Sequence, residues 1–118
     1  MFLKNGNQVS NVSEALKNKE TIRQMKESDI VKAILKYLKT VPGCFAWKEH
    51  GGMYGTAGIP DIICCYRGRF YGFEVKTEDG EPTRLQEATI RKIQKAGGTA
   101  LVVRSVDEVR AVIDGSLQ

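Results

Sequence analysis

Two short segments of the chain hold ionisable residues whose spacing could support hydrolytic chemistry. Asp61 precedes one apolar run, and Glu74-Val75-Lys76 ends the next. A two-residue hairpin loop at Arg67-Gly68, with Gly68 at positive φ, would set the register so that Asp61 falls opposite Glu74. Because side chains alternate along a strand, Lys76 would lie on the same face as Glu74. The sequence thus predicts three ionisable groups converging at one end of a hairpin.

Two opposed carboxylates destabilise a sheet unless a positive charge compensates them. Their Cβ atoms would lie roughly 5 Å apart, a distance at which like charges repel strongly. Mg²⁺ is typically held by one or two carboxylates together with waters and substrate phosphate. We therefore expect Asp61 and Glu74 to bind a divalent cation, with the carbonyl oxygen of Val75 as a further ligand. The alternative is a solvated aspartate at a strand edge and a surface Glu/Lys pair.

The residues around these positions resemble a known nuclease superfamily. Ile59-Pro60-Asp61 followed by Glu74-Val75-Lys76 is similar to the PD-(D/E)XK signature. With Gly58, Gly72-Phe73, Gln86 and Gly97, the segment from about residue 27 to 103 resembles the VRR-NUC (virus-type replication-repair nuclease) branch. The resemblance implies a restriction-endonuclease-like core that binds Mg²⁺ or Mn²⁺ and hydrolyses phosphodiester bonds in DNA.

The resemblance also implies a role for each site residue. Asp61 and Glu74 would be metal ligands, while Lys76 would orient or deprotonate the attacking water and offset charge on the phosphate. Gln86 matches a polar group near the scissile phosphate, although Thr83-x-x-Gln86 also has capping-box spacing. Glu27 matches a glutamate of the first helix and lies on that helix's apolar stripe. Its alternative role is to begin the helix, where negative charge is favourable.

The predicted function is structure-selective cleavage of DNA in replication or repair, similar to Holliday-junction resolution. One chain of 118 residues holds one such site. Paired incisions in four-way or flap DNA therefore predict a homodimer. A non-catalytic DNA-binding or assembly module is one alternative, disfavoured because no carboxylate and no lysine is missing. A sequence-specific restriction-type endonuclease is another, disfavoured because little chain is left to read base edges.

Helices and strands around the site follow from periodicity and from residues that begin or end them. A helix starts at Asn11-Val12-Ser13-Glu14, and helical composition continues to about Thr40 with a break near residues 26–28. Strands are predicted at 44–47, 61–66, 70–75 and 99–103, with Tyr66 facing Arg69 across the hairpin loop. Further helices run over 83–96 and from a capping box at Ser105-Val106-Asp107-Glu108 onward.

This order of elements, αβββαβα, predicts an α/β fold with a mixed central sheet. The central strands are apolar on both faces, which implies helices on both sides of the sheet. Residues 1–26 are interpreted as a partly helical N-terminal extension, and residues 27–118 as the nuclease domain. Trp47 is expected in the core.

Composition and charge fit a soluble, intracellular, cytoplasmic protein, in a host's cytoplasm if the protein is viral. No apolar run approaches the ~18 residues that span a bilayer, and the N-terminus lacks a secretory signal. Three cysteines without C-x-x-C spacing are expected to be small apolar fillers rather than a zinc site.

The net charge of +4 arises in the first forty residues, which hold eight basic and four acidic residues. That excess favours a polyanionic partner such as DNA.

The loop before Asp61 is rich in glycine, at positions 51, 52, 55 and 58. These glycines could let the backbone approach phosphate, with Tyr54 stacking on a base. A flexible hairpin loop is the alternative. His50 lies in this polar loop without a partner motif and is expected to be exposed to solvent.

Overall fold

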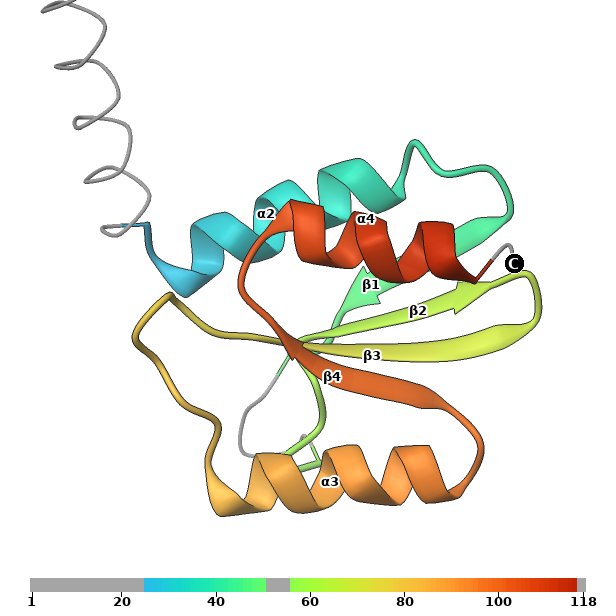
Figure 1. Cartoon of the computed structure of the whole chain (residues 1–118). Coiled ribbons are helices and arrows are strands. Elements are labelled where there is room, and N and C mark those ends of the chain that lie inside the picture. The colour runs from blue at the N-terminus through green and yellow to red at the C-terminus, as the bar shows by residue number, and fades with distance from the viewer. Residues whose placement is uncertain (1–24, 51–55, 117–118) are drawn as a thin grey trace, which may run out of the picture.

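A computed structural model describes residues 25–50 and 56–116 of the chain. They form a four-stranded sheet with helices on both faces (Figure 1). In chain order the elements are α2 (Glu27–Leu38), β1 (Cys44–Lys48), β2 (Ile62–Tyr66), β3 (Arg69–Val75), α3 (Arg84–Lys95), β4 (Thr99–Val103) and α4 (Val106–Gly115). This confirms the predicted α/β, restriction-endonuclease-like class and the predicted order of elements from α2 onward.

The sheet is mixed, with spatial order β1-β2-β3-β4. The pairs β1/β2 and β2/β3 are antiparallel, and β3/β4, which α3 connects, is parallel. Tyr66 pairs with Arg69 as predicted. Both residues of the intervening turn have positive φ, 51° for Arg67 and 79° for Gly68. A two-residue turn with positive φ at both positions has a backbone twist that matches the twist of the flanking strands. The turn therefore fixes the pairing of β2 with β3, on which the predicted site depends.

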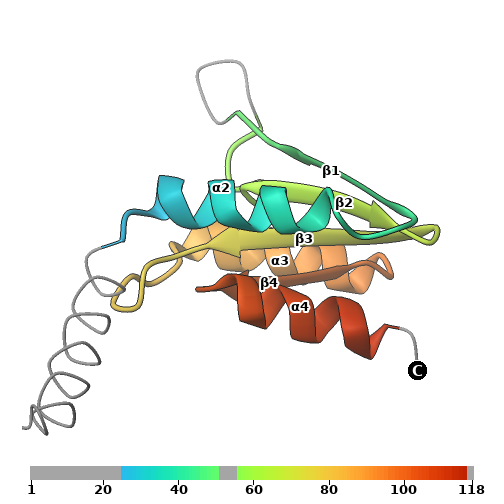
Figure 2. The ribbon, with the colours of Figure 1, turned by 90° about the horizontal axis from the view of Figure 1, so that it is seen from above.

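The two faces of the sheet are covered differently. Helices α2 and α4 lie together on one face and α3 lies on the other, as Figures 1 and 2 show. The main apolar cluster lies between the sheet and the α2/α4 layer. Its helical members are Ile30, Val31, Ile34, Leu38, Val109 and Ile113. Tyr71 and Phe73 of β3 stack in the same cluster, with ring centroids 6.1 Å apart.

The helix termini match the predictions in part. Lys26 is extended and α2 begins at Glu27, where the break was predicted. Helix α3 has the full predicted capping box between Thr83 and Gln86. At α4 the Ser105 hydroxyl accepts from the Glu108 amide, but the Glu108 carboxylate accepts from the Arg104 amide (2.8 Å) instead of completing the box. The predicted helix start at 11–14 and most of the predicted extension, residues 1–26, lie outside the described residues.

Two expectations about burial are wrong. Trp47 is 41% exposed, because β1 is an edge strand and α3 packs over β3 and β4 rather than over β1. Cys65 is exposed on the same face, whereas Cys64 is buried as expected, with its Sγ 3.1 Å from that of Cys44. His50 is exposed, as predicted. No helix within residues 25–50 and 56–116 has the length and apolar character needed to cross a membrane.

Candidate active site

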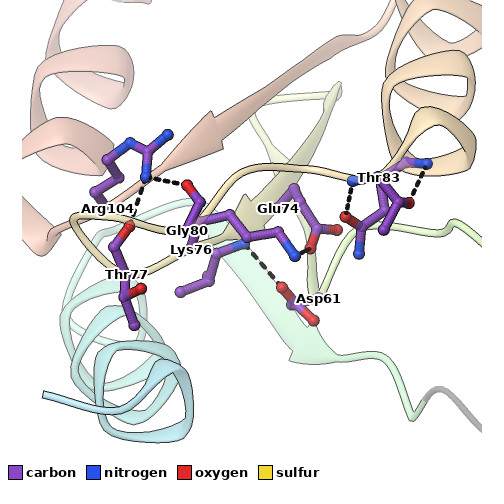
Figure 3. A network of polar contacts seen from close by, with 9 residues as sticks. Asp61, Glu74, Lys76, Thr77, Gly80, Thr83 and Arg104 are labelled. Carbon is purple, nitrogen blue, oxygen red and sulfur yellow. Dashed lines mark hydrogen bonds and ion pairs between the residues drawn. The ribbon is translucent and has the colours of Figure 1, made fainter.

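Asp61 is held at the point where the chain enters β2. The Glu49 amide donates to the Asp61 carbonyl oxygen (2.8 Å), which continues the β1/β2 pairing by one residue. The Asp61 Oδ2 accepts a hydrogen bond from the Val75 amide at 2.8 Å (Figure 3). One step beyond the last strand pair, Ile62 with Phe73, Asp61 is therefore anchored to the strand that carries Glu74.

Two glycines make room for the segment that leads into Asp61. Gly58 has φ of +83°, and a Cβ built there would lie 2.6 Å from the Thr89 hydroxyl and 2.9 Å from Leu85 of α3. A Cβ on Gly72 would lie 2.9 Å from the ring of Pro60. Positive φ and such close contacts are tolerated only by glycine. Gly58 thus serves backbone packing against α3, and Gly72 lets Pro60 pack directly on β3.

Glu74 is the buried member of the site, with a relative exposure of 2%. Its Oε2 lies 3.7 Å from the Lys76 Nζ (Figure 3). Its Oε1 is buried and has no hydrogen-bond partner among the described residues. Lys76 follows β3 directly, and its amide donates to the Val103 carbonyl oxygen (3.1 Å), which extends the β3/β4 pairing past the strand end. A buried carboxylate oxygen without a partner is costly, so this atom calls for a ligand.

The electrostatics of the site disfavour a second negative charge. The pKa of Glu74 is raised to about 8, first by burial, then by the charge of the neighbouring Asp61 carboxylate, and then by the hydrogen bond that the protonated form can make to Asp61. The positive charge of Lys76 lowers the pKa of Glu74 in part. The charge of Glu27 raises this pKa and is the smallest of the causes. Burial and the neighbouring negative charge thus both disfavour the charged form of Glu74, since two carboxylates in one buried site resist joint ionisation.

The donor set fits a hard divalent cation. Asp61 and Glu74 supply carboxylate oxygens, and one of those on Glu74 lacks any other partner. Within the described part of the chain there is no group of three or more His, Cys, Asp or Glu side chains placed to hold a metal. Two carboxylates completed by waters and substrate oxygens are what Mg²⁺ typically uses. The carbonyl oxygen of Val75, whose amide binds Asp61, stays a predicted further ligand.

Glu27 and Gln86 make no hydrogen bond or ion pair with Asp61, Glu74 or Lys76 among the described residues. Glu27 is the exposed first residue of α2 and acts on Glu74 only through its charge. The Gln86 side-chain oxygen accepts from the Thr83 amide at 2.8 Å, so the capping role of Gln86 is confirmed. Its catalytic role stays a prediction, and the side-chain amide nitrogen is the group left for it.

Sequence reasoning missed Arg104, which lies next to the site. Its Nη1 donates to the carbonyl oxygens of Thr77 and Gly80, the latter at 2.6 Å (Figure 3). Its Nη2 lies 3.6 Å from the Glu81 carboxylate. These contacts hold residues 77–81, which connect Lys76 to α3. The available signal was topological, because a residue directly after β4 must lie beside the chain that leaves the parallel strand β3.

The comparison with known proteins rests on structure. The sequence matches no protein-family model and no curated protein. A solved structure of a VRR_NUC domain is 24% identical, with a TM-score of 0.62 over 75% of this chain and 94% of that one. A solved VRR_NUC domain protein is 21% identical, with a TM-score of 0.62 over 76% of this chain and 86% of that one. The chain therefore has the fold of VRR-NUC domains.

Proposed function

We propose that this chain is a VRR-NUC nuclease that hydrolyses phosphodiester bonds in DNA and depends on Mg²⁺ or Mn²⁺. The observation that carries the proposal is the pairing of Asp61 with a buried Glu74 whose Oε1 has no partner, beside Lys76. A purely structural ion pair would satisfy both oxygens of a buried carboxylate. Here one oxygen remains available for a ligand, at a site built on two adjacent strands.

The residues of the site divide the chemistry among them. Asp61 and Glu74 would hold the cation, which supplies Lewis-acid activation of water and of the phosphoryl oxygen when bound. The hydrogen bond from Val75 fixes the Asp61 carboxylate, so its orientation precedes substrate binding. Lys76 presents a positive charge 3.7 Å from Glu74 and would stabilise charge developing on the phosphate. Gln86 would orient a phosphate oxygen or water through its amide nitrogen.

The proposed substrate is branched DNA, with four-way junctions foremost, in replication or repair. The described residues form one candidate site, and a junction is resolved by two symmetric incisions. A homodimer with two-fold symmetry would place two sites accordingly. Support for this finer assignment comes from the VRR-NUC fold.

The test uses the full chain and labelled linear duplex, flap and four-way junction DNA. We expect cleavage with Mg²⁺ or Mn²⁺, none in EDTA, and binding without efficient cleavage in Ca²⁺, whose longer and looser coordination positions water and phosphate poorly. Sedimentation equilibrium gives the oligomeric state, and a junction with distinguishable arms shows whether nicks are paired. Full cleavage in EDTA would reject the metal-dependent mechanism. A monomer that cuts only linear ends would reject the junction assignment while keeping the nuclease.

A further inference from the structure

Helix α3 presents a line of positive charge away from the sheet. Residues 84, 88, 91 and 95 recur at intervals of four, three and four, and at 100° per residue they fall within about 60° of arc. Three of the four are basic: Arg84, Arg91 and Lys95. Thr89 and Ile90, the buried residues of α3, lie on the opposite side of the helix. All three basic side chains are exposed.

The charges of this outward stripe are not neutralised by neighbours. The ion pairs among the described residues involve Lys76, Arg104 and Arg110, and none involves a side chain of α3. Lys92 adds a further exposed cation, and Glu87 is the helix's single acidic residue. Ala88, the small member of the stripe, leaves a shallow hollow that is lined by Ala88, Arg91, Lys92, Gln94 and Lys95.

The opposite layer has the reverse balance. Helices α2 and α4 together hold three basic residues and five acidic ones. The sheet therefore separates a basic helix from a pair of helices with an acidic excess. A polyanion approaching the molecule is attracted toward one layer and repelled by the other.

We infer that the outward stripe of α3, formed by Arg84, Arg91 and Lys95, is the surface that binds the phosphate backbone of DNA. The inference rests on the proposed nuclease function and names the surface on which its substrate lies. From residue 84 to 95 the helix rises about 16 Å, which matches about five base pairs of duplex at 3.4 Å each. Phosphate contacts position a duplex without reading its sequence, as a structure-selective nuclease requires.

The stripe begins at the end of α3 that carries Thr83 and Gln86, which is the end nearest the candidate site. Helix α3 begins at Arg84, directly after Thr83, whose amide and hydroxyl bind Gln86. Gly58 packs against the first turns of the same helix, three residues before Asp61. A duplex bound along α3 would therefore reach the site at the amino end of the helix. The hydrogen bonds between Thr83 and Gln86 and the packing of Gly58 on α3 fix the orientation of this helix relative to the segment that leads to Asp61.

The test compares two double charge reversals with the same spacing on opposite layers. Arg91→Glu/Lys95→Glu changes the α3 stripe, and Lys32→Glu/Lys36→Glu makes the same change in charge at exposed i, i+4 positions of α2. Lys95 and Lys36 both lie in the last turn of their helices, so the effect on the helix dipole is matched. Binding to labelled duplex and four-way junction DNA is measured in Ca²⁺ by fluorescence anisotropy over a salt series.

We expect the α3 variant to bind roughly 10–100-fold more weakly and to lose about two from the slope of log K against log salt, because each phosphate contact contributes about 0.9. In Mg²⁺ its KM should rise while kcat stays near that of the wild type. The α2 variant should change affinity less than about threefold. Equal weakening by both variants, or unchanged binding by the α3 variant, would overturn the inference. A wild-type protein that binds no DNA would instead reject the proposed nuclease function.

Discussion

On one face of the sheet α2 and α4 contribute six buried apolar side chains, whereas on the other face α3 contributes two marginally buried residues, Thr89 and Ile90, each 9% exposed. The main apolar cluster contains members of α2 and α4 and, among the described residues, none of α3. The same face as α3 leaves Phe45 and Phe70 substantially exposed, at 69% and 44%.

The residues that stabilise the fold and the residues of the candidate site therefore lie in different parts of the molecule. The α2/α4 layer excludes water from one side of β3 and so supplies most of the hydrophobic stabilisation. The α3 layer caps the other side thinly, yet it carries the helix start with Gln86 and the basic stripe. The carboxylates lie at the end of the sheet, between the two layers. Substitutions in the α2/α4 layer should therefore alter mainly stability, and substitutions at the α3 side of the sheet mainly activity.

The largest effect is expected from the carboxylates themselves. Asp61→Asn and Glu74→Gln should lower the cleavage rate by roughly 10²–10³-fold or more, because each removes a carboxylate that we propose binds the cation. Stability without metal should be unchanged or higher, since the repulsion between two carboxylates disappears. Asn keeps an acceptor for the Val75 amide, so the hydrogen bond that anchors Asp61 is preserved. Cleavage assays and urea unfolding in EDTA measure the two effects, and normal cleavage by either variant would remove that residue from the site.

A matched pair of isoleucines tests the contrast between the layers. Ile34 of α2 is fully buried, and Ile90 of α3 is 9% exposed at the thin side of the sheet. Ile34→Ala should lower the free energy of unfolding by about 3–5 kcal/mol, and Ile90→Ala by about 1–2 kcal/mol, because the cost grows with the cavity left behind. Chemical denaturation of both variants measures the difference. Equal losses would show that α3 supports the fold as much as α2 does.

The sequence predicted the fold and the central pair of the site from local rules. Alternation and turn chemistry gave all four strands and the hairpin register, because a two-residue turn leaves a single pairing for Tyr66 and Arg69. The capping box at Thr83 and Gln86 was predictable for the same reason, since its partners are three residues apart. Proximity of Asp61, Glu74 and Lys76 followed from that register.

The features that escaped prediction depend on contacts between distant segments. Trp47 is apolar, but its exposure is decided by which strands α3 covers, and periodicity does not specify that. Arg104 binds carbonyl oxygens 24 to 27 residues away, across the parallel strand pair. The role of Gly58 depends on its approach to Leu85 and Thr89. The basic excess before residue 41 stands, but the neutral sum from residue 41 onward conceals the basic stripe of α3, which becomes visible only when charge is counted helix by helix.

The pH dependence of stability should report on Glu74. Its pKa is raised from 4.5 to about 8 in the folded state, so the folded protein holds a proton that the unfolded chain releases between these values. The contribution of Glu74 to the free energy of unfolding without metal should therefore be largest below about pH 4.5 and decrease, on the order of a few kcal/mol, as pH rises to about 8. Glu74→Gln should flatten this slope. Unfolding in EDTA at several pH values measures it, and an identical slope in both proteins would contradict the raised pKa.

The smallest effect concerns the segment between the layers that Arg104 organises. Its guanidinium binds the carbonyl oxygens of Thr77 and Gly80, so it restrains the connection from Lys76 to α3. Arg104→Lys keeps one positive charge but loses the planar guanidinium, whose Nη1 binds both carbonyl oxygens while Nη2 faces Glu81. We expect it to lower stability by about 1 kcal/mol and kcat by about 10-fold, with KM little changed, because Lys76 and Gln86 would be less well positioned. Amide exchange in residues 77–81 should accelerate.

Arg110→Lys is the matched control for that substitution. Arg110 pairs with Asp107 on the exposed side of α4, where both side chains are at least half exposed. The ion pair contributes about 0–1 kcal/mol, and the contact of the guanidinium with the Tyr37 ring, 4.8 Å from its centroid, contributes a similar amount. Neither contact involves residues 77–81, so the change should leave kcat and amide exchange in that segment unaltered. If Arg104→Lys lowered stability without changing kcat, Arg104 would belong with the α2/α4 layer as a residue of the fold. If kcat falls for Arg104→Lys and the Arg110→Lys control keeps its activity, the segment between Lys76 and α3 positions residues that the reaction needs.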